Sequence, residues 1–311
     1  MTDVSPVQRG IPAPPGSTSL PEPELSCPPP HPSPRTPARR LPENSCDSHC
    51  HVFGPAARFP YALERTFTPV DAPVGQLAAL HKHLGLDRAV IVQSSCHGTD
   101  HSALLDALAV GGGQYRGVAL IGPATPRAEI ERLDAAGVRG FRLHFLPHLG
   151  EPPTRAEIQS VVGLVADLGW HAEIHLHSAG IAQYDELIRW FPVPVVIDHL
   201  ARLDLSQGLD SPAVSALLRL LDTGRVWVKT SGVDRVSRTG PPYADAVVLA
   251  ARLVAHAPER VLWGTDYPHP NIVGPAPDDG LLVDLLPLIA PSEPVLRRML
   301  VQNPEEFFGF S

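Results

Sequence analysis

Two histidines separated by one residue, His49 and His51, are the residues of this chain best suited to chemistry. They stand in the string CDSHCHVFGP, near the start of the apolar part of the chain. Residues two apart in a β-strand point to the same face, so both imidazoles project together with Asp47 behind them. Side by side, two imidazoles make sense when they converge on a metal ion, a substrate oxygen or a water molecule. The alternative is a pair of hydrogen-bonded histidines in a polar loop.

Polar side chains of the same kind end the other strand-like apolar runs. Asp266 closes the run in VLWGTDYPHPN, and the run before QSSCHG leads to Ser95 and His97. The remaining runs end in or lead to Arg142, His144, His175, His177, Asp198, His199, Arg202, Lys229 and Arg235. A capped helix start or a hydrogen-bonded barrel histidine could explain any one of them. Together they predict a catalytic site where the strands end.

The elements that must position these residues alternate regularly after residue 45. Strand-like runs are predicted at 46–52, 89–94, 117–121, 138–145, 171–177, 193–199, 226–231 and 260–266. Helical patterns are predicted at 71–84, 100–110, 125–136, 154–168, 183–190, 211–222, 243–256 and 280–289. Eight strands alternating with eight helices predict a parallel sheet closed as an α/β barrel of the TIM type, (β/α)8, with its chemistry at the carboxyl ends of the strands. An open doubly wound sheet is the alternative, but the first strand is not followed by a GxGxxG turn.

Composition narrows the class of protein. The chain has 311 residues, 43% of them hydrophobic, and a formal net charge of −8, which argues against a nucleic-acid partner. No apolar run is long enough for a membrane span, and the N-terminus lacks the apolar core of a secretory signal. The four cysteines show no disulfide or zinc-finger spacing, which predicts a cytoplasmic protein. The sequence leaves the oligomeric state open.

The first 44 residues form a separate region before the predicted barrel of residues 45–311. They contain 13 of the 36 prolines and no periodic apolar pattern. Such a segment buries too little surface to offset its ordering entropy, so we expect a Pro-rich tail that is disordered or draped over the domain. A polyproline ligand for a partner is the alternative to a passive tail.

The chain resembles the 2-pyrone-4,6-dicarboxylate lactonase branch of the amidohydrolase superfamily. The resemblance covers residues 46 to about 308 and is carried, in order, by DSHCHVFGP, FPYALERTFTP, VIVQSSCHG, AGVRGFR, LGW, VVIDHL, VLWGTDYPHPN and PDDGLLVDLLP. It implies hydrolysis of a cyclic ester bearing acidic groups, in bacterial breakdown of aromatic compounds. By motif position, Asp266 matches the residue that activates water, and His49, His51 and His199 match the histidines around the scissile carbonyl. The positions that match groups holding substrate carboxylates or shaping the pocket are Ser95, Arg142, Arg235 and Asn271.

Three positions depart from the pattern of this branch. His148 stands where the branch has an arginine for a substrate carboxylate, His175 replaces a tyrosine, and Phe67 replaces a tyrosine after the ER dipeptide. The lost arginine and hydroxyl make another acidic lactone, such as 4-sulfomuconolactone, a second candidate substrate.

The departure at His175 also bears on metal binding. The resemblance implies a branch that works without a bound metal, whereas metal-dependent members of the superfamily have histidine at this position. His49, His51, His175 and Asp266 would supply three nitrogens and one oxygen to a divalent ion, which suits Zn²⁺ or Mn²⁺. In the alternative, His175 is a neutral hydrogen-bond donor. The sequence interpretation prefers a divalent metal to none.

The predicted reaction is the same with or without the metal. Asp266 takes a proton from water, water adds to the lactone carbonyl, and the ring opens as the bond between the carbonyl carbon and the ring oxygen breaks. Arg142, Arg202 and Arg235 offer planar guanidinium groups for carboxylate or sulfonate groups of a small acidic lactone. A metal-dependent decarboxylase of the same superfamily and a non-catalytic barrel that binds acidic metabolites are the alternatives.

Overall fold

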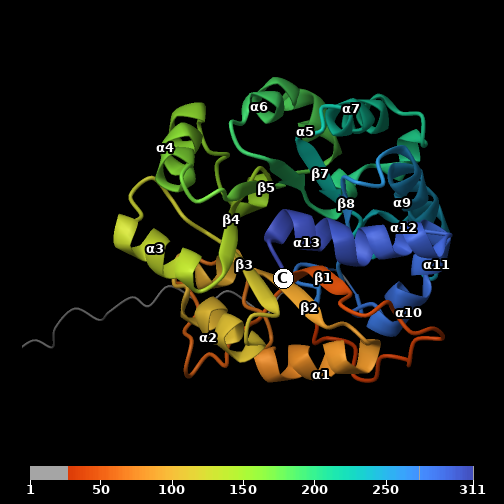
Figure 1. Cartoon of the computed structure of the whole chain (residues 1–311), viewed down its shortest axis with the longest axis horizontal. Helices are drawn as coiled ribbons and strands as arrows, with labels where there is room; N and C mark the ends of the chain where they lie inside the picture. Colours follow the sequence, from red (N-terminus) through yellow and green to blue (C-terminus); the bar gives the residue numbers. More distant parts are fainter. Residues whose placement is uncertain (1–26, 273, 311) are drawn as a thin grey trace, which may run out of the picture.

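Eight short parallel strands, hydrogen-bonded in chain order, form the centre of the molecule (Figure 1). The computed structural model describes residues 27–272 and 274–310. The strands are β1 (Cys46–Cys50), β2 (Arg88–Val92), β3 (Tyr115–Ala119), β4 (Val138–His144), β5 (His171–His175), β6 (Val195–Ile197), β7 (Val226–Lys229) and β8 (Val261–Leu262). The predicted parallel (β/α)8 barrel is confirmed.

The ring closes between the first and last strands, beyond the short β8. Backbone bonds of 2.8 Å join Ser48 N to the Trp263 carbonyl and Asp266 N to the His49 carbonyl. Gly264 permits this approach, because a Cβ atom at that position would lie 2.5 Å from the backbone nitrogen of His49. The strand predicted at 260–266 is therefore shorter than expected, but its continuation still brings Asp266 beside the HxH pair.

The helices surround the sheet and follow the predicted alternation, with some breaks. They are α1 (Val74–Leu84), α2 (Ser102–Gly111), α3 (Arg127–Ala135), α4 (Arg155–Val165), α5 (Ser178–Gln183), α6 (Asp185–Trp190), α7 (Pro212–Leu221), α8 (Val233–Val236), α9 (Ala244–His256), α10 (Asp279–Asp284), α11 (Leu286–Ile289), α12 (Glu293–Arg297) and α13 (Asn303–Phe308). Short 3₁₀ turns are η1 (Ser95–His97), η2 (Pro147–Leu149), η3 (His199–Arg202) and η4 (Leu205–Gln207), and a π-helical turn, η5 (Arg298–Gln302), joins α12 to α13. Among the described residues, no helix is both long and apolar enough to span a bilayer.

Local sequence signals explain several of these boundaries. Thr154 caps α4 in a capping box with Glu157, and the Ser211 hydroxyl accepts a bond from Val214 N at the start of α7. The helix predicted at 280–289 is split into α10 and α11 just before Pro287, which has no backbone N–H to donate. The helical segment from residue 293 onward lies outside the predicted alternation.

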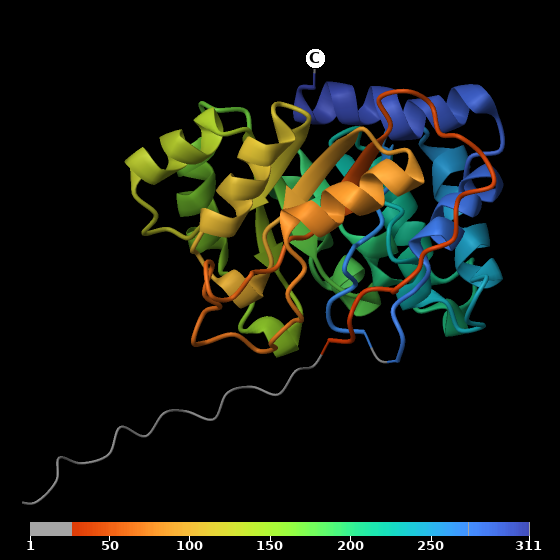
Figure 2. The ribbon, with the colours of Figure 1, turned by 90° about the horizontal axis from the view of Figure 1, so that it is seen from below.

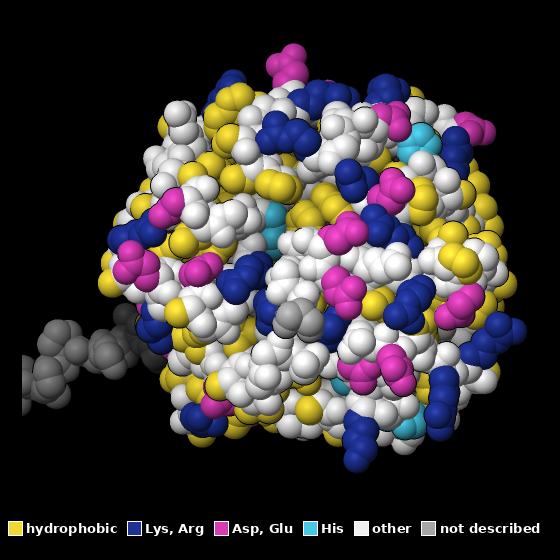
Figure 3. Space-filling view, in the orientation of Figure 1, with side chains coloured by type: hydrophobic (Ala, Val, Ile, Leu, Met, Phe, Trp, Pro, Cys, Tyr) yellow, Lys and Arg dark blue, Asp and Glu magenta, His cyan; other side chains and the backbone are white. Residues whose placement is uncertain are grey.

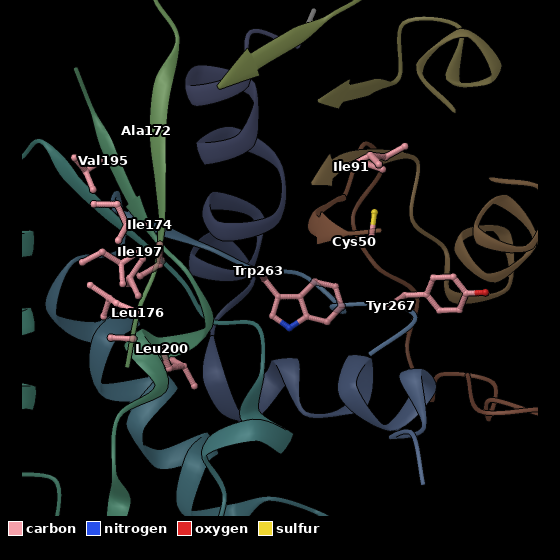
Figure 4. Close-up of a cluster of buried hydrophobic side chains, with 14 of the residues drawn as sticks. Cys50, Ile91, Ala172, Ile174, Leu176, Val195, Ile197, Leu200, Trp263 and Tyr267 are labelled. Carbon is pink, nitrogen blue, oxygen red and sulfur yellow. The ribbon is translucent and has the colours of Figure 1, made fainter. Parts of the chain in front are cut away.

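Apolar side chains pack on both faces of the sheet. Ile91 belongs to the main core between strands and helices, whereas its neighbour Val90 packs with Phe308 and Phe310 from the end of the chain. Figure 4 shows part of the main core, where Ile174 and Ile197 from adjacent strands lie together. Figures 1 and 2 place α13 across one end of the barrel, opposite the loops that follow the strands. On the face drawn in Figure 3, positive and negative side chains are interspersed.

The N-terminal segment, residues 27–44, runs along the side of the barrel before β1 (Figure 2). Arg35 contacts Asp278 through its backbone nitrogen at 3.0 Å and its Nε at 2.9 Å. Further along, Ala38 N donates to Asp284 Oδ1 at 2.7 Å. The expected Pro-rich tail is therefore draped over the domain from residue 27 onward, while residues 1–26 lie outside the described part of the chain.

Candidate active site

A small pocket of about 70 Å³ lies where the strands end, and it gathers almost every residue that the sequence predicts for the site. The predicted residues that line it are His51, Ser95, Arg142, His148, His175, His199, Arg202, Arg235, Asp266 and Asn271. His49 is fully buried beside them. His97 and His177, also found at strand ends, are not among the described lining residues.

Asp266 is the carboxylate around which the site is built. Its Oδ1 lies 3.2 Å from Nε2 of His51 and 3.8 Å from Nε2 of His49, and its Oδ2 lies 3.9 Å from Nδ1 of His199. The Nε of Arg235 donates to Oδ2. Burial by itself would raise the pKa of Asp266, but Arg235 and then the histidines outweigh it and hold the pKa well below its usual range. Asp266 is therefore ionised and faces the pocket as a proton acceptor.

Unusual backbone conformations place the catalytic candidates. Asp266 has a left-handed φ of 67°, and the four residues of η3 all have positive φ, between 45° at Arg202 and 55° at Ala201. None of these residues is glycine, so each conformation costs free energy that the surrounding contacts must offset. Gly232, with φ of 76°, packs against His199, where a Cβ would lie 3.0 Å from the histidine Cβ. Such strain at the end of β6 indicates a site in which the positions of His199 and Arg202 matter.

The hydrogen bonds of His51 fix its orientation. Its Nδ1 lies 2.7 Å from the Val92 carbonyl, which can only accept, so Nδ1 carries a proton. In the neutral ring, Nε2 then has a lone pair that faces the Asp266 carboxylate at 3.2 Å. Two acceptors at this distance require a proton donor or a cation between or beside them. The pair is therefore suited to take a proton from a bound water molecule.

Beneath the pocket lies a buried charge network that we call the charged floor: His49, Arg142, Glu173, Asp198 and Lys229. Lys229 donates to Glu173 and lies 2.9 Å from Nδ1 of His49. Arg142 contacts Asp198 at 2.9 Å through Nε and at 2.7 Å through Nη2. Together with the Arg235–Asp266 pair, the site contains three carboxylates and three basic side chains that form ion pairs with them. A buried charge without a partner is costly, so each of these groups depends on the one opposite it.

Sequence reasoning did not single out Glu173. Glu173 lies in the middle of β5, whose sequence is HAEIH. The period-two geometry of a strand places His171, Glu173 and His175 on the same face. All three side chains are buried, and Glu173 is fully so. A carboxylate between two histidines on the inward face of a barrel strand is the signal that could have identified it.

His175 lies at the edge of the pocket, close to other histidines. Its ring centroid is 5.3 Å from that of His199 and 5.8 Å from that of His144, and neither of its nitrogens has a hydrogen-bond partner in the described structure. Burial, followed by the charge of Arg142, lowers the pKa of His175 well below its usual value. Burial also lowers the pKa of His199 to about 3, so both rings are neutral. Phe67, the residue that replaces a tyrosine, is buried in the pocket wall.

Three groups in the described structure bring possible metal ligands together. Asp47, Cys50 and His81 form one; His49, Glu173 and Asp198 form the second, where the Lys229 ammonium already lies; His49, His199 and Asp266 form the third. The ligand atoms of the third group lie within 4.8 Å of one another, and Nε2 of His49 is buried without a hydrogen-bond partner. Imidazole nitrogen and carboxylate oxygen are donors that fit Zn²⁺ or Mn²⁺. Of the four predicted ligands, His49 and Asp266 are in this group, and His51 and His175 are not.

The comparisons with known proteins cover nearly the whole described chain. The sequence model of the amidohydrolase family matches residues 46–310. A 2-pyrone-4,6-dicarboxylate hydrolase of Comamonas testosteroni is 41% identical over 89% of this chain and 93% of that protein. A 4-sulfomuconolactone hydrolase of Hydrogenophaga intermedia is 38% identical over 86% of this chain and 90% of that protein.

Among solved structures, an apo protein of Agrobacterium tumefaciens superposes with a TM-score of 0.79 and 30% identity. The superposition covers 88% of this chain and 99% of the other. Each of these similarities includes the strands that place the pocket.

Proposed function

This chain belongs to the amidohydrolase family, and we propose that it is a hydrolase that opens a lactone carrying acidic groups, such as 4-sulfomuconolactone or 2-pyrone-4,6-dicarboxylate, in the breakdown of aromatic compounds. The observation that carries the proposal is the position of Asp266, an ionised carboxylate in contact with histidines in a pocket edged by arginines. The two relatives named for lactone hydrolysis support the same class of reaction.

The reaction begins with proton transfer to the carboxylate. Asp266 accepts a proton from a water molecule beside His51 while that water adds to the lactone carbonyl. The same proton then reaches the ring oxygen as the ring opens. Neutral His49 and His199 lie on the other sides of the carboxylate, where imidazole N–H groups can stabilise the developing oxyanion.

The acidic groups of the substrate need cations that are not already engaged. Arg142 is paired with Asp198 and Arg235 with Asp266. Arg202 has no ion pair or hydrogen bond among the described residues, so its guanidinium is the main anchor that we assign for a carboxylate or sulfonate. The other predicted substrate-binding residues, which surround the pocket, are Ser95, His148 and Asn271.

A divalent ion, Zn²⁺ or Mn²⁺, is the second part of the proposal. Held by His49, His199 and Asp266, it would polarise the lactone carbonyl as a Lewis acid. Metal analysis by mass spectrometry on protein purified without chelator, together with turnover in EDTA, tests it. About one ion per chain and loss of turnover in EDTA would support the metal, whereas no ion and full turnover in EDTA would remove it and leave the hydrolase proposal intact.

Product analysis tests the reaction class. We expect each acidic lactone that is consumed to gain one water and release one equivalent of acid. Release of CO₂ would instead identify a decarboxylase. Saturable binding of acidic lactones without any turnover, with or without added Zn²⁺ or Mn²⁺, would identify a binding protein.

A further inference from the structure

A second, larger hollow lies directly outside the active-site pocket. Its volume is about 660 Å³, against about 70 Å³ for the inner pocket, and Arg202, Arg235 and Asn271 line both. The two spaces adjoin at these residues, so a substrate that does not fit within the inner pocket can extend into the outer hollow.

Most charged groups that line the outer hollow already have partners. Arg35 is paired with Asp278, and Arg235 is paired with Asp266. Two groups are left among the described residues: the guanidinium of Arg202, and the carboxylate of Asp234, whose Oδ1 is buried without a hydrogen-bond partner.

These two unpaired groups have complementary requirements. The guanidinium of Arg202 supplies donors in a planar fork that matches a carboxylate or a sulfonate. The carboxyl group of Asp234, which belongs to the wall of the hollow, can form a hydrogen bond with a hydroxyl of the ligand. A ligand that satisfies both must therefore bring an anionic group and a hydroxyl to the same hollow.

Part of the wall lies outside the segment that the family model matches. His31 and Arg35 line the hollow from the N-terminal segment, whereas the family match begins at residue 46. Contacts of Arg35 and Ala38 with Asp278 and Asp284 hold this segment in place. The outer hollow is thus built partly from residues that the family match does not include.

We propose that the outer hollow is a subsite for a hydroxylated, acidic side arm of the substrate, with Arg202 binding the acid and Asp234 accepting the hydroxyl. The inference rests on the proposed hydrolase function and adds to its candidate substrates the lactones whose acid lies on a side arm that also carries a hydroxyl. The ring carbonyl then reaches Asp266 in the inner pocket while the arm lies outside it.

Two lactones and three variants test the subsite. D-Glucaro-1,4-lactone has an arm with a hydroxyl and a carboxylate, and 5-oxotetrahydrofuran-2-acetate has the carboxylate without the hydroxyl. We expect Arg202→Met to raise KM for both by about 50-fold, and Asp234→Ala to raise KM about tenfold for the hydroxylated lactone alone, with kcat changed little. The control is Arg40→Met. Arg40 belongs to the N-terminal segment but does not line this hollow, so this variant should have the same KM and kcat as wild type.

Binding of D-glucarate, the open-chain diacid, shows whether the subsite proposal or the hydrolase proposal is wrong. Calorimetry with D-glucarate should show a loss of affinity of about 50-fold in Arg202→Met and of about tenfold in Asp234→Ala. Turnover of neither lactone, with this binding pattern intact, would contradict hydrolysis of this class of lactone and support the subsite. Unchanged KM and unchanged glucarate affinity in Arg202→Met, or equal effects of Asp234→Ala on both lactones, would overturn the subsite.

Discussion

The charged floor and the rim of this site differ in the elements that supply them and in the pairing of their charges. The floor residues come from β1, β4, β5, β7 and the end of β6, are buried, and have their charges paired. The rim, by which we mean His148, Arg202, Asp234 and Asn271, comes from two 3₁₀ turns, the short helix α8 and a loop, and it keeps a guanidinium and a carboxylate oxygen without partners. Charged side chains that form ion pairs with one another keep fixed positions, whereas those without a partner are available to bind a ligand. We infer that the floor sustains the chemistry and the rim selects the substrate.

The largest effect should come from Asp266, the carboxylate that lies beside His49, His51 and His199. Asp266→Asn keeps the size of the side chain but cannot accept a proton, so we expect kcat to fall by about 10³-fold with an unchanged circular dichroism spectrum. Asp284→Asn, which alters only a contact to the N-terminal segment, is the matched control. If Asp266→Asn keeps more than about a tenth of the wild-type kcat, Asp266 is not the base.

The floor can be broken by removing one of its cations. Lys229→Met leaves Glu173 buried without its partner, and we expect the free energy of unfolding in urea to fall by about 3–5 kcal/mol. Adding Glu173→Gln removes the uncompensated charge, so the double variant should recover part of that loss. A double variant no more stable than Lys229→Met would show that the pair is not what stabilises the floor.

The difference between floor and rim also explains how much the sequence could predict. Period-two alternation and strand-end position were enough to predict the barrel and to bring His49, His51, His199 and Asp266 together, because strand geometry is regular. The same alternation contained Glu173, but a lone carboxylate on a strand gives no sign of its partner Lys229, which lies 56 residues later.

The rim could not be predicted in the same way. Arg202 owes its position to a run of left-handed residues, and nothing in the string HLAR requires that conformation. The wall around it uses His31 and Arg35, which belong to a Pro-rich segment without periodic pattern. Tertiary contacts, rather than local preference, place these residues.

His175 lies between the two regions and tests the ligand set predicted from sequence. The described structure leaves it outside the group formed by His49, His199 and Asp266. His175→Gln, a neutral replacement of similar length, should therefore leave any bound metal in place and change kcat by less than about tenfold. Metal analysis and turnover on the same preparation check this. Loss of bound metal in His175→Gln, with metal present in wild type, would restore the predicted ligand set.

The smallest effect concerns the loop that supports the rim. His269 follows Asp266 by three residues, is fully buried, and its Nε2 lies 3.0 Å from Asp279 Oδ1 in α10. Burial alone would lower the pKa of His269, but Asp279 outweighs it and the pKa is raised. A raised pKa means that the stabilisation is fully present below the pKa of unfolded histidine and is lost as pH rises through the folded pKa.

Substitution of His269 should therefore cost more stability in acid than in base. We expect His269→Gln to lower the free energy of unfolding by about 2 kcal/mol more at about pH 5.5 than at about pH 9, measured by urea titration. His256→Gln is the matched control, because His256 makes the same kind of contact with Asp222, at 2.7 Å, on an exposed surface where ion pairs contribute little. Equal losses at both pH values would show that His269 holds the rim loop by packing rather than by charge.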